Sequence, residues 1–444
     1  MDFTPHTEAD VAAMLTTVGA DSVDALFSQI PEDVRLGRPL DLPPGGAEVE
    51  VADALARLAA RNRTLEDLVC FAAGGVSDHY VPAVVSGLAG RSEFFTSYTP
   101  YQPELSQGVL QALFEFQTMV VELTAMDASN ASLYDGATAL AEAVSMTLAP
   151  DRRRVLVSGA VDPRLVATLR TYAAGTGAEI TTWEVPDGHG PPPAVAEGAA
   201  AVIVQHPNVC GILEDAPAAA VAHEAGARLI QVFDPVSLGV LVPPGELGAD
   251  LAVGEGQPFG NQLQYGGPNL GLLACRIADV RKMPGRIVGE TVDLEGRTGY
   301  VLTLQAREQH IRREKATSNI CTNQTLMALA ATIHLAWLGP DGLREQGERC
   351  AAATAYATDR LTALPGVECR FPDAAVFRDV ALALPFDADE VIDRMLDRGF
   401  LAGTTHPGDP RTLLVGVTER RTRDEIDAFA EAMADVLAGA EVAG

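Results

Sequence analysis

The chain has 444 residues, with 60 acidic side chains against 32 basic ones, which gives a formal net charge of −28 and a pI near 4.6. Nucleic acids and anionic membranes require a cationic surface, so this balance argues against both as partners. The 47% hydrophobic residues form no uninterrupted apolar run of about 18, which argues against a membrane span. No basic and then apolar leader opens the sequence, and we expect a cytoplasmic protein.

Only two of the basic residues, Lys282 and Lys315, are lysines. Chemistry that needs a lysine amine therefore has two candidate positions. A lysine-poor, acidic and alanine-rich composition is typical of a GC-rich genome and also of adaptation to high salt, where dense carboxylates are screened. The sequence leaves these two explanations open.

The six cysteines stand singly along the chain. They form no Cys-x-x-Cys pair and no cysteine and histidine spacing typical of zinc. We therefore expect no metal site, and we interpret these residues as reduced and mostly buried.

Residues 1–62 are predicted to form a helical arm. Thr7 with Asp10 is typical of a capping box, and apolar residues then recur at helical spacing, before a Pro- and Gly-rich stretch at 42–46. Such an arm cannot bury both of its faces by itself. We expect it to pack on another domain or subunit.

Residues 63–335 are predicted to form a large α/β domain. From Arg154 onward, short apolar runs alternate with segments of helical periodicity, which favours a parallel, doubly wound sheet with helices on both faces. Ligands of such sheets bind at the carboxyl ends of the strands. The expected strands are 155–157, 180–185, 201–204 and 229–233, and the expected helices are 163–174 and 216–225.

Residues 336–444 are predicted to form a small α+β domain, an ordinary size for a domain. Helical periodicity at 326–338 spans the boundary with the preceding domain, and a second helical segment is predicted at 342–364. The expected strands are 376–384 and 413–417, and the expected helices are 388–399 and 422–437.

The segment 94–108 has the most unusual composition. Two prolines favour an extended backbone, while Tyr98, Tyr101, Gln102 and Glu104 place hydroxyl, amide and carboxylate groups on one short loop. Recognition of a small ligand and a rigid surface connection both explain this pattern.

A turn rich in glycine and hydroxyl groups at 130–139 precedes a predicted helix that runs to about Leu148. The free N–H groups of such a helix N-terminus can bind a phosphate. However, Asp135 lies where the phosphate would bind, and a carboxylate repels it. An Asp N-cap of an ordinary helix explains the sequence equally well.

Asp234 directly follows the apolar run 229–233 and so is expected at the carboxyl end of a core strand. In pyridoxal phosphate enzymes of the aminotransferase type, such an Asp keeps the pyridine nitrogen protonated. The Schiff-base lysine of such enzymes is expected roughly 20 to 30 residues further on. The segment 250–260 contains none.

The two lysines present fit that role poorly. Lys282 lies beyond the next predicted strand, and Lys315 ends a charged stretch, 307–315, that has the pattern of a helix with Glu308 and Arg312 at i,i+4 spacing. This stretch, with Arg307, Arg312 and Arg313, is either a solvated face or a basic patch for a partner or anionic ligand.

Long segments of the chain resemble the glycine cleavage system P-protein family, in the form of subunit 1 of the two-subunit glycine dehydrogenase (decarboxylating). One departure is Ser77-Asp78-His79, where the family usually has Tyr-Asp-His. The matching segments are 97–108, 114–119, 130–143, 254–257, 265–268, 283–289 and 307–324.

The resemblance implies a fold of the aspartate aminotransferase type, which is the type I fold of pyridoxal phosphate enzymes. It also implies an enzyme active only as a complex, a hetero-tetramer with two copies of each subunit, in which subunit 2 holds pyridoxal 5′-phosphate on its own lysine. The implied reaction is decarboxylation of glycine with transfer of the aminomethyl group to the lipoyl arm of the H-protein. This chain then resembles a partner copy without cofactor, with Asp234 as a vestigial cofactor-binding residue.

By position in the family motif, the resemblance implies a set of residues that reach into the partner's active site: Tyr98, Thr99, Tyr101, Gln102 and Glu104. Asp78 and His79 are weaker candidates, since a single histidine is more often structural. Two alternatives remain: a self-sufficient pyridoxal phosphate transaminase or lyase that uses Lys282 or Lys315, and a scaffold subunit without contact to the chemistry.

Overall fold

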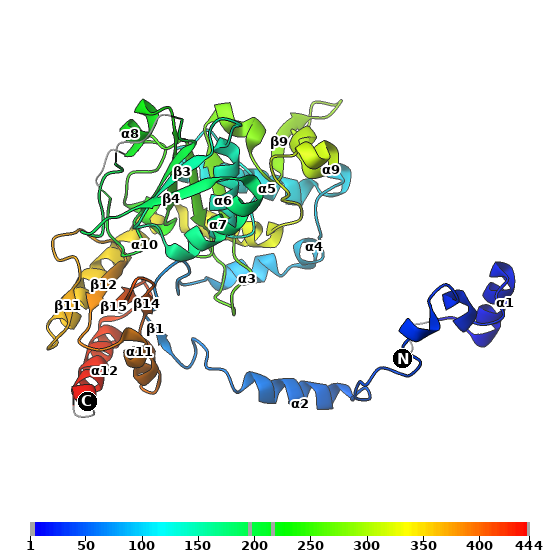
Figure 1. The fold of residues 1–444 in the computed structure, drawn as a ribbon, viewed down its shortest axis with the longest axis horizontal. Coiled ribbons are helices and arrows are strands. Elements are labelled where there is room, and N and C mark those ends of the chain that lie inside the picture. The colour runs from blue at the N-terminus through cyan, green and yellow to red at the C-terminus, as the bar shows by residue number, and fades with distance from the viewer. Residues whose placement is uncertain (1–4, 194–197, 215–217, 442–444) are drawn as a thin grey trace. The chain divides into compact units, whose positions relative to one another are not determined.

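The computed structural model describes residues 5–193, 198–214 and 218–441. They belong to two compact units, Met1–Arg63 and Thr64–Gly444 (Figure 1). The three-part division into 1–62, 63–335 and 336–444 stays a prediction.

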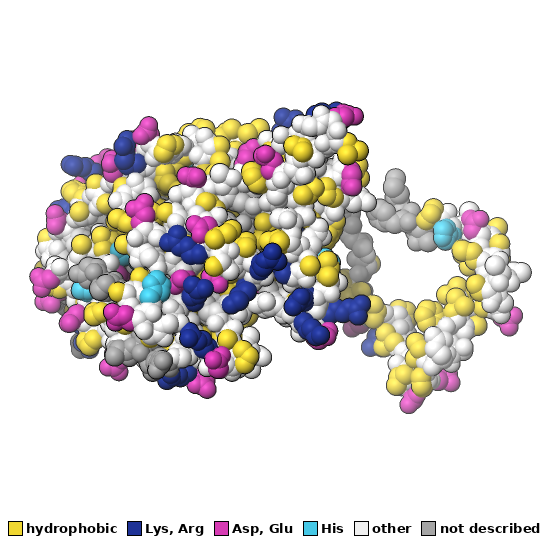
Figure 2. Space-filling view, turned by 90° about the horizontal axis from the view of Figure 1, so that it is seen from above, with side chains coloured by type: hydrophobic (Ala, Val, Ile, Leu, Met, Phe, Trp, Pro, Cys, Tyr) yellow, Lys and Arg dark blue, Asp and Glu magenta, His cyan; other side chains and the backbone are white. Residues whose placement is uncertain are grey.

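The first unit contains the helices α1 (Glu8–Val18) and α2 (Glu48–Ala59), with the 3-10 turns η1 (Asp24–Phe27) and η2 (Glu32–Val34) between them. The predicted capping box is confirmed, because the Thr7 N–H donates to Asp10 Oδ2 at 2.8 Å. None of these four elements has a buried residue. Apolar side chains therefore cover much of the described surface of this unit (Figure 2).

The second unit is built on a seven-stranded sheet, and the predicted parallel-rich, doubly wound architecture is confirmed. The five strands from β7 to β4 are parallel, while β8 and β2 add an antiparallel edge. In spatial order the strands are β2 (Ala128–Ser129), β8 (Gly271–Cys275), β7 (Leu251–Glu255), β6 (Arg228–Phe233), β5 (Ala201–His206), β3 (Arg154–Ser158) and β4 (Glu179–Trp183).

Alternating side chains of this sheet enter two separate cores. In β5, Ala201 and Ile203 pack with α6 (Gly136–Thr147) and α7 (Pro163–Thr176). Val202 and Val204 pack on the opposite face with α5 (Gln107–Thr124), α8 (Ala218–Glu224) and α10 (Thr325–Thr362), as expected for a strand buried on both sides (Figure 1). The part of the predicted helix 216–225 before Ala218 lies outside the described residues.

The C-terminal part packs α11 (Ala388–Leu396) and α12 (Arg423–Glu441) on a four-stranded antiparallel sheet. The strand order is β11 (Glu368–Cys369), β12 (Asp379–Ala383), β15 (Asp409–Gly416) and β14 (Thr404–His406). A separate parallel pair joins β1 (Val69–Cys70) to β13 (Phe400–Leu401). The predicted strands and helices of this region are therefore present.

The helix α10 is broken at Gly339, whose φ of 65° is not helical, and at Pro340. This break separates the two helical stretches that the sequence predicts. Among the described residues, α10 is the one helix long and apolar enough to cross a membrane, and 44% of its most apolar window is buried in the structure. Its buried residues belong to the protein core.

The prediction of one helix over 307–315 is wrong. The chain instead forms three short turns, η6 (Gln305–Arg307), α9 (Gln309–Arg312) and η7 (Arg313–Lys315). Arg313 has a φ of 54° and a ψ of −130°, which ends the helix, and the Glu308 side chain is buried instead of facing solvent. Local i,i+4 spacing does not override these tertiary contacts.

Candidate functional site

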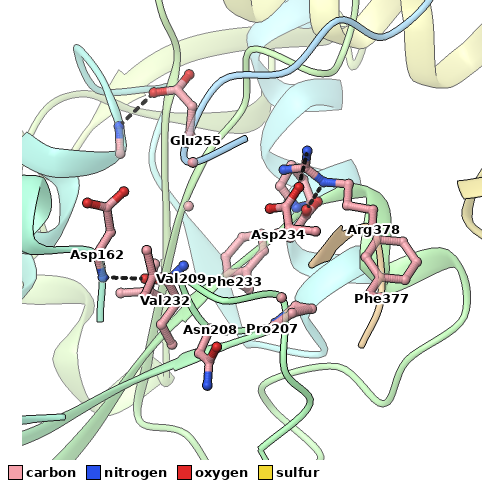
Figure 3. A pocket seen from close by; sticks show the side chains of 18 of the residues that line it. Asp162, Pro207, Asn208, Val209, Val232, Phe233, Asp234, Glu255, Phe377 and Arg378 are labelled. Carbon is pink, nitrogen blue, oxygen red and sulfur yellow. Dashed lines mark hydrogen bonds and ion pairs between the residues drawn. The ribbon is translucent and has the colours of Figure 1, made fainter. Parts of the chain in front are cut away.

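The carboxyl ends of β5, β6 and β7 meet at a narrow cavity of about 70 Å³ (Figure 3). Residues 207–209 and 233–235, which follow two of these strands, line it together with 377–379 from the C-terminal part of the chain. This is the edge at which doubly wound sheets bind their ligands. A cofactor would therefore bind here if the residues around the cavity could hold it.

Asp234 follows β6, as the sequence predicts, and its carboxylate is already paired. Its Oδ2 accepts a hydrogen bond from Arg378 Nε, and its Oδ1 accepts one from the Val236 N–H at 2.9 Å (Figure 3). Arg378 Nη1 also lies 3.5 Å from Asp379 Oδ1. The Asp234 and Arg378 side chains are only 12% and 6% exposed, so this buried ion pair leaves Asp234 no free charge for a pyridine nitrogen.

Glu255, at the end of β7, fills the N-terminus of α6. Its Oε2 accepts the Gly136 N–H at 2.9 Å, and its Oε1 accepts the N–H groups of Gln257 and Leu270, also at 2.9 Å (Figure 3). Burial raises the pKa of Glu255 to about 7, against the effect of these three donors. A carboxylate of the chain thus takes the place at which a helix N-terminus binds phosphate.

Asp135 caps the same helix. Its Oδ1 accepts the Thr138 N–H at 2.7 Å, and Thr138 Oγ1 accepts the Asp135 N–H at 3.3 Å. Of the two interpretations open for this turn, the structure bears out the N-cap. With Glu255 beside it, two carboxyl groups of the chain occupy this terminus, and neither favours the binding of a phosphate dianion there.

The residues of this cavity do not fit pyridoxal phosphate. Lys282, at the end of η5 (Ile277–Lys282), and Lys315 are exposed, and neither lines the cavity. Pockets for drug-sized ligands are roughly 300 to 1,000 Å³, well above the space present here. Among the described residues that line the cavity there is no lysine amine and no free helix N-terminus for a phosphate, and the volume is too small for the cofactor.

The second candidate site is the loop 94–108, called the tyrosine loop from here on. Tyr98 and Tyr101 are 71% and 52% exposed, although each hydroxyl has a partner. The Tyr98 hydroxyl lies 3.0 Å from Thr322 Oγ1, and the Tyr101 hydroxyl accepts a hydrogen bond from Arg286 Nη2 at 3.0 Å. The loop therefore presents ordered aromatic side chains to solvent.

The other predicted residues of the tyrosine loop lie beside these tyrosines in sequence. Gln102 and Glu104 are exposed, and Glu104 lies in the short turn η3 (Pro103–Leu105). Thr99 is half-buried, and its hydroxyl has no hydrogen-bond partner among the described residues. Their assignment as site residues stays a prediction.

The segment 318–324 is held by Ser132 and by Arg286, the same arginine that contacts Tyr101. Arg286 Nη1 donates to the Cys321 carbonyl at 3.0 Å, and Asn323 exchanges two hydrogen bonds with Ser132, at 2.7 and 3.0 Å. Cys321 is exposed. Slight desolvation opposes ionisation of its thiol, but hydrogen bonds from Thr322 and Tyr101 outweigh it and lower the thiol pKa.

Asp78 and His79 are buried in ion pairs that join their segment to 418–421. Asp78 pairs with Arg420 and, at 3.2 Å, with Arg421, while His79 Nδ1 lies 2.6 Å from Glu419 Oε2. Burial opposes the charge of Glu419, but its bonds to His79 outweigh this and hold its pKa at about 2. Neither residue lines the cavity of Figure 3, so the geometry indicates a structural role.

Sequence reasoning missed Glu255, Arg286 and Arg378 as functional residues. Glu255 and Arg286 lie within quoted motifs, but their partners are 119 and 185 residues away in the sequence. Arg378 pairs across 144 residues with Asp234. A carboxylate in the segment that should carry the Schiff-base lysine was the one signal available for Glu255.

Known proteins resemble this chain over nearly its whole length. The family model described as "Glycine cleavage system P-protein" matches residues 1–433. Proteins named probable glycine dehydrogenase (decarboxylating) subunit 1 are 49% identical in Moorella thermoacetica, over 99% of this chain and 100% of that protein, and 46% identical in Chlorobaculum parvum, over 98% and 100%.

Solved structures agree with these relatives. A crystal structure of glycine decarboxylase (P-protein) of the glycine cleavage system, in inhibitor-bound form, is 47% identical and superposes with a TM-score of 0.91, over 98% of this chain and 100% of that one. An aspartate aminotransferase from Thermus thermophilus is 18% identical with a TM-score of 0.58, over 83% and 99%, and it shares the fold alone. The predicted aminotransferase-like fold is therefore confirmed.

Proposed function

Because the chain belongs to the glycine cleavage system P-protein family, we propose that it is the subunit of a glycine decarboxylase that carries no cofactor. The complete enzyme decarboxylates glycine and transfers the aminomethyl group to the lipoyl arm of the H-protein. The chain acts only in complex with subunit 2, in the cytoplasm, as a hetero-tetramer with two copies of each subunit.

The observation that carries this proposal is the closed cofactor seat. Glu255 occupies the α6 N-terminus, Arg378 neutralises Asp234, and the cavity between them measures about 70 Å³. The match to the glycine cleavage P-protein family and to glycine dehydrogenases, together with the aminotransferase-like fold, supports the use of pyridoxal phosphate by the complete enzyme. Subunit 2 therefore holds pyridoxal 5′-phosphate.

The contribution of this chain is the tyrosine loop, which extends into the partner's active site. Its residues Tyr98, Thr99, Tyr101, Gln102 and Glu104 supply hydroxyl, amide and carboxylate groups that orient the reacting groups. The exposure of both tyrosines supports this assignment, because ordered aromatic side chains at a surface are typical of an interface.

Reconstitution tests the proposal. The chain is mixed with subunit 2, H-protein and cofactor, and exchange of bicarbonate into glycine is measured for Tyr98→Phe, Gln102→Ala and Glu104→Ala. Tyr356→Phe is the control, since its hydroxyl bonds Asp427 at 2.8 Å outside the tyrosine loop. We expect reduced exchange in the three loop variants only. Unchanged exchange in all three would leave the chain as a scaffold subunit.

The alternative of a self-sufficient enzyme is tested with the chain alone. Borohydride reduction in the presence of pyridoxal phosphate followed by peptide mapping reports any imine on Lys282 or Lys315. We expect no stoichiometric labelling, because both amines are exposed and lie outside the cavity lining.

A further inference from the structure

Arg286 is a buried cation whose hydrogen-bond partners are all neutral, and its charge also helps to lower the pKa of the nearby Cys321 thiol. It is 5% exposed, and its guanidinium donates to the Cys321 carbonyl and to the Tyr101 hydroxyl, each at 3.0 Å. The guanidinium carbon lies 4.9 Å from the centre of the Tyr101 ring. Within the described part of the chain, no carboxylate lies within ion-pair distance of Arg286. This is unusual, because buried charges are normally paired.

The backbone fixes Arg286 in this position. Its carbonyl accepts the Ala131 N–H at 2.8 Å, and the carbonyl of the nearby Pro284 accepts Asn130 Nδ2 at 3.0 Å. Gly285 between them has a φ of 70°, a conformation that other residues rarely adopt. These contacts fix the backbone from which the side chain extends, while the hydrogen bonds to the Cys321 carbonyl and the Tyr101 hydroxyl hold the guanidinium itself.

The contact with Arg286 also fixes what the Tyr101 hydroxyl can do. Arginine only donates hydrogen bonds, so the Tyr101 oxygen is the acceptor. Its acceptor within the chain is the Cys321 thiol, a weak acceptor that a carboxylate from outside would replace, and the Tyr101 side chain is 52% exposed. Tyr98 differs, because either atom of its contact with Thr322 can be the donor.

We propose that Tyr101 and Arg286 together bind a carboxylate that comes from outside this chain, with Tyr101 as the hydrogen-bond donor and Arg286 as the source of positive charge. A carboxylate supplies both the acceptor and the missing counter-charge, whereas the sulfur of a disulfide is a weak, neutral acceptor. The inference rests on the proposed function. It leaves two sources for the carboxylate, namely the substrate glycine and an Asp or Glu side chain of subunit 2.

The test uses the reconstituted complex of this chain with subunit 2 and H-protein. Tyr101→Phe removes the donor, Arg286→Gln removes the charge, and Arg286→Lys keeps the charge without the planar fork. The controls are Tyr356→Phe and Arg349→Gln, which alter hydrogen bonds to Asp427 and Glu345. For each variant, subunit assembly is measured by sedimentation, KM for glycine and for H-protein from bicarbonate exchange, and folding from the melting temperature.

If the ligand is glycine, KM for glycine rises about tenfold or more in Tyr101→Phe and Arg286→Gln, while assembly is unchanged. If it is a carboxylate of subunit 2, the dissociation constant of the subunits rises by a similar factor and KM for glycine is unchanged. In both cases Arg286→Lys retains more function than Arg286→Gln.

Two results would overturn the inference. One is a change in KM for H-protein alone, which would assign Tyr101 to the lipoyl arm. The other is a Tyr101→Phe variant whose KM for glycine and subunit dissociation constant change no more than those of the controls. Tyr101→Phe decides the question even if Arg286→Gln fails to fold. The proposed function fails separately, if the wild-type chain neither assembles with subunit 2 nor supports exchange.

Discussion

Replacing Arg378 by methionine removes the guanidinium that pairs with Asp234 and lies 3.5 Å from Asp379 Oδ1. Methionine retains apolar bulk in the cleared space, so the substitution mainly removes charge. The two carboxylates then remain in the protein interior without this cation. The substitution therefore tests whether the ion pair that closes the cofactor seat stabilises the fold.

The burial of the three side chains sets the size of the effect. The side chains of Arg378, Asp234 and Asp379 are 6%, 12% and 11% exposed. Removing one partner of a buried pair lowers the free energy of unfolding by about 3 to 5 kcal/mol, because the remaining charge is uncompensated. Asp234→Asn should cost less, about 1 to 3 kcal/mol, since Arg378 keeps Asp379 as a partner.

Urea denaturation at two pH values measures both effects. Burial already raises the pKa of Asp379, and loss of Arg378, whose charge lowers it, raises it further. When the pKa of a carboxyl is higher in the folded state than in the unfolded state, the folded protein loses stability as the pH rises. Arg378→Met should therefore be less stable relative to wild type at pH 8 than at pH 5.

The control is Arg349→Met, which breaks an exposed pair with Glu345 on α10 and should change the free energy of unfolding by about 0.5 kcal/mol or less. The reasoning is refuted if Arg378→Met costs no more than this control, or if its cost does not depend on pH.

Three further predictions concern the same region. Burial raises the pKa of Glu255 from 4.5 to about 7, so its contribution to stability is full below about pH 4.5 and is lost as the pH rises through 7. In thermal melts, Glu255→Gln should remove this part of the pH dependence. Asp135→Ala removes the N-cap of α6 and should lower the free energy of unfolding by about 1 kcal/mol in urea, whereas an unchanged value would contradict the cap. Gly211→Ala should cost roughly 3 kcal/mol or more, because φ is +80° and the new Cβ would lie 1.8 Å from the Asp379 carbonyl oxygen. The tolerated control is Gly175→Ala in α7, where the new Cβ would meet nothing within 4 Å outside its own helix.

The core strands were predictable because their burial leaves a direct trace in the sequence. Strands β3, β5 and β6 are buried on both faces, so each appears as a short apolar run between segments of helical spacing. The break in α10 was also visible, because Gly339 and Pro340 interrupt the helical pattern. Such local signals depend on few tertiary contacts.

The pairing partners were not predictable in the same way. Glu255 occupies the α6 N-terminus only because that terminus lies against the end of β7, and Asp234 is ion-paired only because Arg378 approaches from the C-terminal part of the chain. The prediction of one helix over 307–315 was wrong for the same reason, since Glu308 faces the interior and not the solvent. Hydrophobic periodicity does not report which polar groups the fold brings together.

The most direct test of the central claim is the location of the cofactor in the assembled enzyme. The complex of this chain with subunit 2 is loaded with pyridoxal phosphate, reduced with borohydride and analysed by mass spectrometry of each separated subunit. We predict a phosphopyridoxyl group on a lysine of subunit 2 and none on this chain. A stoichiometric label on Lys282 or Lys315 would contradict the account.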